Sequence, residues 1–177
     1  MNNSRSKFWD NKILGWEKDR YILNNKKNLL NSVQERLKIT ETIIKKFISN
    51  KNVLEIGCGS GLLAEKIINS GAKSYTGYDF AASAILKAKE RCKDKKNIFF
   101  YDKSIMDIEE KNDYDFVFSL GLIDWLSRSE INHLAKVSNE KDWLHSFSEK
   151  RLSFVQIVHK IYVILFYGYK NGMYIPR

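Results

Sequence analysis

The sequence is poor in cysteine and almost devoid of proline. Its only cysteines are Cys58 and Cys92, too few for a disulfide framework or a cysteine-rich metal cluster, and this favours a reducing compartment. Long apolar runs are missing as well, since no stretch approaches the ~20 apolar residues that cross a bilayer. The polar start of the chain, MNNSR, has no apolar signal core behind it. These absences predict a cytoplasmic protein with no transmembrane segment and no bound metal.

Composition and charge predict a single globular domain. Of the 177 residues, 44% are hydrophobic and 29% are charged, which suits a packed core rather than a disordered chain. The formal net charge of +9 invites a nucleic-acid-binding interpretation. The lysines, however, are spread along the whole chain. The densest group, RCKDKK at residues 91–96, falls where a helix is expected to end and positive charge is favourable in any case. A nucleic-acid partner is therefore not the favoured expectation.

The most informative stretch is VLEIGCGSGLLA at residues 53–64. It predicts a short buried strand, a tight turn and the first turn of a helix, because Gly57, Gly59 and Gly61 permit backbone conformations that side chains oppose. The helix amides after such a turn can bind a ligand. A dinucleotide fingerprint would need its third glycine at Leu62, and no Lys-Ser/Thr pair follows the turn to make a phosphate-binding loop. The stretch therefore predicts a site for a nucleotide-like cofactor of another kind.

A second signal is the acidic residue that ends the next predicted strand. Residues 73–78 are typical of a strand, and Asp79 follows them, about 20 residues beyond the glycines, where a carboxylate can accept both hydroxyls of a ribose. The same residue is also suited to cap the helix expected at residues 81–91, and the two roles are compatible.

Taken together, Glu55 two residues before Gly57, the alternating glycines and Asp79 resemble the first motifs of the class I S-adenosylmethionine-dependent methyltransferases. The resemblance implies an α/β fold with a doubly wound, Rossmann-like sheet, and S-adenosylmethionine as the cofactor. It also implies cofactor contacts from one set of positions in this chain: Glu55, Gly57, Cys58, Gly59, Gly61, Asp79, Phe80, Ser104, Ile105 and Ser119.

The adenine position departs from the family pattern. The third strand is expected at residues 97–101, and the family's acidic adenine ligand a few positions later falls on Ser104, with Ile105 beside it. Either the Ser104 hydroxyl takes this role, or a shifted loop brings Asp102 or Asp107 to the adenine; the sequence leaves both open.

The remaining pattern predicts five strands. The fourth covers residues 113–120 and the fifth residues 142–148, with a helix at 127–137 between them. The family resemblance implies the order 3-2-1-4-5 for these strands. The family's sheet has seven strands, so strands 6 and 7 are apparently lacking. The expected organisation is a helical N-terminal cap (1–50), a cofactor-binding core (51–148) and a C-terminal helical segment (149–177). If the chain is a shortened form of its family, this last segment is truncated.

The edge of the fifth strand then needs a cover, because an open edge invites pairing with other chains. We expect this edge to be covered either by a second copy of the chain in a homodimer or by the C-terminal helix. The apolar run at residues 161–167 is expected to form a cap helix over the substrate-binding side of the sheet. The alternative is that this run contacts a membrane surface or a second copy of the chain.

The favoured function is in-line methyl transfer to a small-molecule acceptor. The Asn/Asp-Pro-Pro-aromatic and Pro-Cys or Thr-Cys motifs of base-methylating enzymes do not follow the fourth strand. Methyl transfer from a sulfonium needs mainly alignment, so the motif names no catalytic residue; Asp124 and His145 are the weak candidates for a base. Trp9, Trp16 and Tyr21 are expected to shape the acceptor pocket.

Two alternatives belong to other functional classes. A methyltransferase-like binding protein without catalysis is one, motivated by the missing strands, and an RNA methyltransferase that uses the positive surface is the other. Within the family, residues 33–36 and 146–150 are loosely similar to magnesium-protoporphyrin O-methyltransferases.

Overall fold

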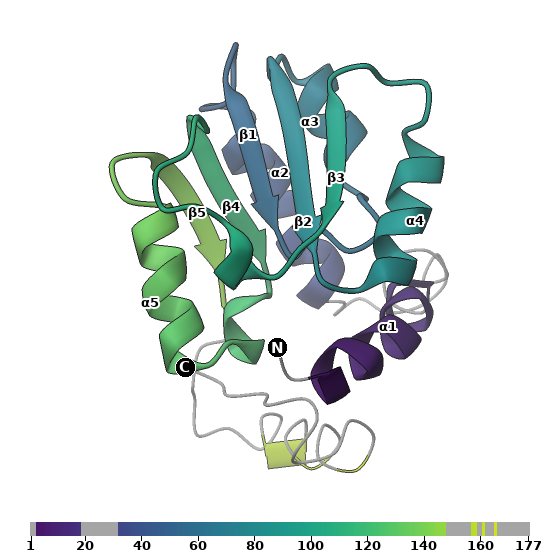
Figure 1. Cartoon of the computed structure of the whole chain (residues 1–177). Helices are drawn as coiled ribbons and strands as arrows, with labels where there is room; N and C mark the ends of the chain where they lie inside the picture. The colour runs from purple at the N-terminus through teal and green to yellow at the C-terminus, as the bar shows by residue number, and fades with distance from the viewer. Residues whose placement is uncertain (1–2, 19–31, 148–156, 159–160, 162–164, 166–177) are drawn as a thin grey trace.

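The computed structural model describes residues 3–18, 32–147, 157–158, 161 and 165, and its centre is a five-stranded parallel sheet (Figure 1). The strand order is β3-β2-β1-β4-β5, as predicted. The strands are β1 (Asn52–Ile56), β2 (Ser74–Asp79), β3 (Ile98–Asp102), β4 (Phe116–Leu120) and β5 (Asp142–Ser146). No sixth or seventh strand occurs among the described residues.

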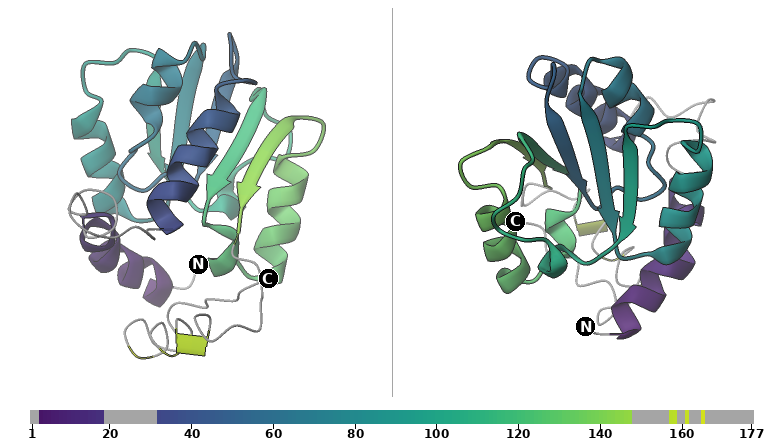
Figure 2. Two further views of the ribbon diagram at one scale, coloured as in Figure 1. Left: turned by 180° about the vertical axis from the view of Figure 1, so that it is seen from behind. Right: turned by 45° about the horizontal axis from the view of Figure 1, so that its top comes forward.

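Helices cover both faces of the sheet. On one face lie α2 (Ser32–Ile44), α3 (Ala64–Asn69) and α4 (Ala82–Arg91), and in the view from behind α2 crosses in front of the sheet (Figure 2). The other face carries α5 (Arg128–Val137) and two short 3-10 helices, η2 (Ile105–Asp107) and η3 (Ile123–Trp125). A parallel sheet covered on both faces is the arrangement that near-continuous apolar strands require.

The central strand β1 separates two apolar clusters. Val53 packs into the cluster that includes Ile44 of α2 and Ile67 of α3, whereas Leu54 packs into the cluster that includes Leu134 of α5. Both β1 side chains are completely buried. Because parallel strands all run the same way, their carboxyl ends gather at one edge, and the loops at that edge form the ligand-binding end of such a sheet.

The helix α1 (Asn3–Glu17) lies across this carboxyl edge, next to α4 (Figure 1). Trp9 packs there against Ala81 and Ala84. The predicted helical character of the N-terminal segment is confirmed for α1 and α2. The helix after the glycine turn begins at Ala64, two residues later than predicted, because residues 61–63 still complete the turn and Leu63 provides no side-chain cap.

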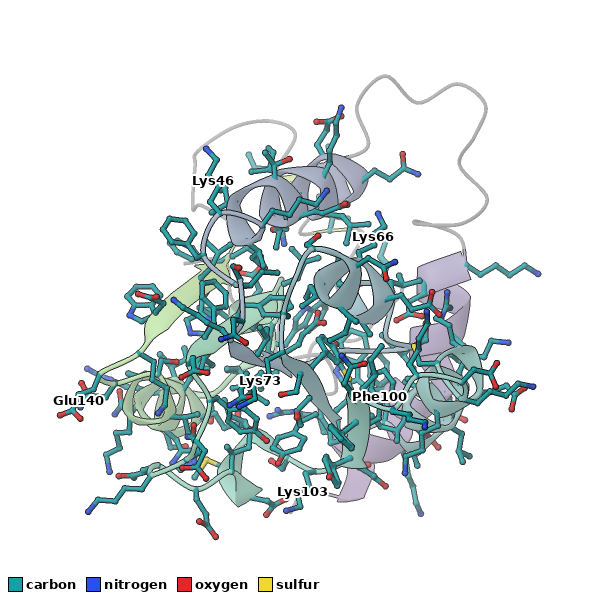
Figure 3. The ribbon with its side chains drawn as sticks, turned by 90° about the horizontal axis from the view of Figure 1, so that it is seen from above. Lys46, Lys66, Lys73, Phe100, Lys103 and Glu140 are labelled. Atoms are coloured by element: carbon teal, nitrogen blue, oxygen red, sulfur yellow. The ribbon has the colours of Figure 1, made fainter. Side chains whose placement is uncertain are left out.

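Most of the C-terminal segment lies outside the described residues, so its predicted cap helix, membrane-surface contact and dimer contact stay predictions. In the part of the chain that the structure describes, no helix is long and apolar enough to cross a membrane. Seen from above, four labelled lysines, Lys46, Lys66, Lys73 and Lys103, come from separate places around the sheet (Figure 3). They do not line up along one groove.

Candidate functional site

The glycine turn between β1 and α3 has a backbone that only glycine adopts easily. Gly57, Gly59 and Gly61 have φ values of 76°, 53° and 71°, in the left-handed region. A side chain at Gly61 would also meet the Phe100 ring, since a Cβ there would lie 2.7 Å from Cζ. The turn therefore requires glycine for two independent reasons, conformation and space.

Asp79, at the end of β2, holds the turn through its carboxylate. One carboxylate oxygen accepts a hydrogen bond from the Gly59 amide and the other accepts one from the Ala81 amide, both at 2.9 Å. The N-cap of α4 is Ala81, without a side-chain bond, so Asp79 braces the turn rather than occupying the cap position. Burial raises the pKa of Asp79 from 3.8 to about 6.

Glu55 lies deeper, on β1, and accepts a short hydrogen bond from the Tyr75 hydroxyl. Its pKa is raised from 4.5 to about 8, chiefly by burial and to a smaller extent by the nearby Glu17 and Asp79 carboxylates. The carboxyl group is therefore mostly protonated at neutral pH in this structure. The Cys58 thiol, also buried, has its pKa raised by the same surroundings.

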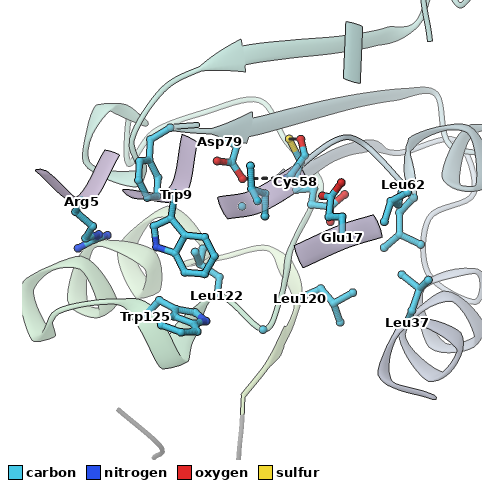
Figure 4. A pocket seen from close by; sticks show the side chains of 17 residues that line it. Arg5, Trp9, Glu17, Leu37, Cys58, Leu62, Asp79, Leu120, Leu122 and Trp125 are labelled. Atoms are coloured by element: carbon cyan, nitrogen blue, oxygen red, sulfur yellow. Dashed lines mark hydrogen bonds between the residues drawn. The ribbon is translucent and has the colours of Figure 1, made fainter. Parts of the chain in front are cut away.

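These groups face a cavity of about 840 Å³, counting the open solvent at its mouth (Figure 4). Its centre is polar, with Glu17, Asp79 and the backbone of the turn. Apolar and aromatic side chains form the two ends: Trp9 and Trp125 at one, Leu37 and Leu62 at the other. The full lining is Arg5, Trp9, Ile13, Glu17, Leu37, Glu55, Gly57, Cys58, Gly59, Leu62, Leu63, Asp79, Phe80, Leu120, Gly121, Leu122 and Trp125.

One face of α1 forms the roof of this cavity. Its lining residues Arg5, Trp9, Ile13 and Glu17 recur every four positions, the spacing that places side chains on one face of a helix. The Trp9 ring meets the Trp125 ring edge to face, with centroids 4.8 Å apart. Of the residues expected to shape an acceptor pocket, Trp9 lies in the wall, whereas the Trp16 side chain and Tyr21 lie outside the described part.

A smaller cavity adjoins the first at the predicted adenine position. Phe80, Ser104 and Ile105 line it together with Asp79. The Ser104 side chain and Asp107 form a capping box that starts η2, so Asp107 is engaged there. Neither Asp102 nor Asp107 is among the residues that line this cavity. The geometry thus favours Ser104 over the shifted-loop alternative, although its cofactor role stays a prediction.

Four predicted site residues in the described part of the chain line neither cavity: Gly61, Ser119, Asp124 and His145. His145, on β5, shares hydrogen bonds of 3.0 Å with the hydroxyls of Ser119, at Nδ1, and Ser138, at Nε2. The neutral ring donates one of these bonds and accepts the other. Burial lowers its pKa to about 4, so the imidazole is neutral at physiological pH. Asp124 is buried within η3. Among the described residues, none of His145, Ser119 or Asp124 lines a cavity wall with the glycine turn.

Sequence reasoning missed ten of the wall residues, and the four that matter most here are Glu17, Leu37, Leu122 and Trp125. The four-residue spacing from Trp9 through Ile13 was a signal that could have found Glu17. The other three come from segments whose place beside the turn depends on tertiary packing.

Comparisons with known proteins agree with this geometry. A family model described as "Methyltransferase domain" matches residues 53–139. The match begins at β1 and ends just after α5, and it includes the glycine turn and Asp79. Residues 53–139 form a methyltransferase domain of the class I S-adenosylmethionine-dependent family.

Relatives and solved structures within the family differ in what they act on. The chain is 32% identical over 101 residues to a malonyl-[acyl-carrier protein] O-methyltransferase of Bacillus anthracis, covering 54% of this chain and 37% of that protein. It is 26% identical over 96 residues to a tRNA U34 carboxymethyltransferase of Vibrio cholerae, covering 52% of this chain and 29% of that protein. The chain thus spans about a third of the length of these curated relatives.

The fold also matches the crystal structure of magnesium protoporphyrin IX methyltransferase from Synechocystis PCC 6803 with bound SAH. That comparison has a TM-score of 0.65 at 17% sequence identity and covers 90% of this chain and 77% of the other. At this identity the likeness shows the Rossmann-like methyltransferase fold and nothing finer.

Proposed function

We propose that this chain binds S-adenosylmethionine at the glycine turn and transfers the methyl group to a small acyl acceptor. The observation that carries the proposal is the cavity at the carboxyl edge of the sheet. There a left-handed glycine turn, held by Asp79, meets a cavity whose walls are mostly apolar and aromatic, with a few polar groups at its centre, as in small-molecule sites.

The residues present fit this cofactor. The ionised Asp79 carboxylate has about four acceptor positions and uses two of them on backbone amides, so ribose hydroxyls still find acceptors there. Phe80, Ser104 and Ile105 would hold the adenine in the smaller cavity. Glu55 and Gly57 would hold the methionine end, in the part of the larger cavity that they line.

When bound, the cofactor supplies a methyl group on a sulfonium, which is already activated. The chain therefore contributes binding and orientation, which can lower a barrier by roughly 7–11 kcal/mol. Trp9, Trp125 and Leu122 form an apolar wall that excludes water from the cavity. The carboxyl groups among the described lining residues, Glu17, Glu55 and Asp79, already accept hydrogen bonds within the chain, so an acceptor whose nucleophile is unprotonated at neutral pH, such as a carboxylate, suits the site best.

Two features support an acyl acceptor. The relatives named malonyl-[acyl-carrier protein] O-methyltransferase methylate such a group, and they are among the more similar curated proteins found. Arg5 is the only cation among the described lining residues of the cavity, on the same helix face as Trp9. Glu130 accepts two of its five guanidinium N–H groups, and the remaining ones would orient an acid at the cavity rim.

Calorimetric titration with S-adenosylhomocysteine tests the binding half of the proposal. Wild-type protein is expected to bind with micromolar affinity, and Asp79→Ala to weaken binding at least tenfold, because the variant loses the carboxylate and leaves the Gly59 amide unpaired. Asp102→Ala is the matched control, since Asp102 lies opposite Asp79 on β3 but is exposed and outside the cavity. Wild-type protein that does not bind would refute the proposal.

Methyl transfer is then measured with labelled S-adenosylmethionine and malonyl thioesters, free and carried on acyl carrier protein. Binding of S-adenosylhomocysteine without transfer to any acceptor would favour the alternative of a non-catalytic methyltransferase-like protein. An RNA acceptor, the alternative related to the tRNA-modifying relatives, would instead show RNA binding that weakens steeply with salt.

A further inference from the structure

The amides of the glycine turn are all engaged within this chain. Those of Gly57 and Cys58 donate to the Tyr78 carbonyl, and that of Gly61 donates to the Cys58 carbonyl. The Gly59 amide donates to Asp79. The fifth amide, that of Ser60, is different, because its hydrogen-bond partner does not belong to the segment from β1 to the end of β2.

The Ser60 amide donates to the Glu17 carboxylate of α1 at 2.8 Å. The carboxylate is buried and lies directly against the turn, since a Cβ at Gly59 would come within 2.2 Å of its Oε1. Arg91 braces the same residue from the other side, with its guanidinium donating to the Ser60 carbonyl and hydroxyl. Figure 4 shows Glu17 close to Cys58 and pointing into the cavity. An anion of the protein itself thus fills the amide position that the turn would present to a ligand.

The rest of α1 is fastened to both sides of the cavity. Arg5 makes a bidentate ion pair with Glu130 of α5, with distances of 2.8 and 3.0 Å. Asp10 accepts a hydrogen bond of 2.7 Å from the Ser83 amide in the first turn of α4. The helix therefore bridges α4 and α5 above the cavity, and Glu17 closes the end nearest the turn.

We propose that α1 is a lid and that Glu17 is an internal competitor, which must leave the Ser60 amide before the cofactor can bind at the glycine turn. This inference rests on the proposed function, because it concerns access to the same site. In this arrangement the contact with Glu17 keeps the empty site closed and slows association of the cofactor.

Stopped-flow measurement of S-adenosylhomocysteine association tests the proposal, with fluorescence from Trp9 and Trp125 as the signal. Glu17→Ala is expected to associate about tenfold faster than wild type, with equal or tighter affinity, because one charge-assisted hydrogen bond no longer holds the lid. Glu17→Gln keeps a neutral acceptor for the Ser60 amide and should gain only about two- to threefold. Glu90→Ala is the matched control, because it removes an exposed acid from α4 that has no part in the site.

Hydrogen exchange without ligand gives a second readout. In Glu17→Ala the amides of α1 should exchange faster than in wild type while those of β1 and β2 remain unchanged. Unaltered exchange in α1 would overturn the lid, and weaker cofactor binding by Glu17→Ala would make Glu17 a ligand of the cofactor rather than its competitor. If S-adenosylhomocysteine binds wild type and Glu17→Ala at the same rate, only this inference fails. If it binds none of the variants, the proposed function fails as well.

Discussion

Replacing Glu55 with glutamine should change how the stability of the protein depends on pH. The pKa of Glu55 rises from 4.5 to about 8 on folding, mainly because its carboxyl group loses contact with water. The folded protein therefore keeps a proton that the unfolded chain has released between these pH values. The stabilisation that this proton represents is complete below pH 4.5 and is lost as the pH rises to about 8. At about 1.36 kcal/mol per pH unit, the full effect is of the order of 5 kcal/mol.

Glutamine has nearly the same shape, carries no charge and keeps an oxygen that can accept the hydrogen bond from Tyr75. The Glu55→Gln variant is thus expected to lose much less stability than wild type between pH 5 and pH 8, as measured by urea unfolding. Glu35→Gln, at an exposed position on α2, serves as the control and should follow the wild-type profile. Identical pH profiles for Glu55→Gln and wild type would mean that Glu55 is ionised in the folded protein, and the reasoning from burial would be wrong.

Three further substitutions probe other contacts. Gly77→Ala should destabilise the protein by roughly 1–3 kcal/mol, measured by thermal unfolding, because a Cβ would lie 2.8 Å from the Cys58 sulfur. Adding Cys58→Ala should restore part of this loss, and no recovery would point to another cause. A histidine whose pKa is lowered from 6.5 to about 4 on folding reduces the stability of the protein as the pH falls through this range, and His145→Asn should remove that loss. The affinity for S-adenosylhomocysteine should stay unchanged, and a loss of affinity would reveal a role in binding. Trp9→Ala should release α1 selectively, seen as faster hydrogen exchange in that helix alone, whereas uniform acceleration across the sheet would show that Trp9 supports the whole fold.

The sequence by itself was sufficient for the sheet and for the turn at its centre. Alternating glycines after an apolar strand specify a left-handed turn wherever the rest of the chain lies, since the restriction is local to each residue's φ and ψ. The position of Asp79 follows from the same local unit of strand, turn, helix and strand. The alternation of strands and helices was sufficient to predict a parallel sheet, whereas the order of its five strands was expected from the family resemblance.

Tertiary structure alone decided which distant side chains meet the turn. Glu17 and Ser60 are 43 residues apart, and their contact exists because α1 packs on α4 across the carboxyl edge of the sheet. The sequence placed His145 on the correct strand. The alternation of side chains along β5, however, directs its ring to Ser119 on β4 and to Ser138, directly after α5, rather than to the cavity. Local backbone preferences can be read along the chain, whereas these contacts depend on how the packed helices and strands bring remote side chains to one edge of the sheet.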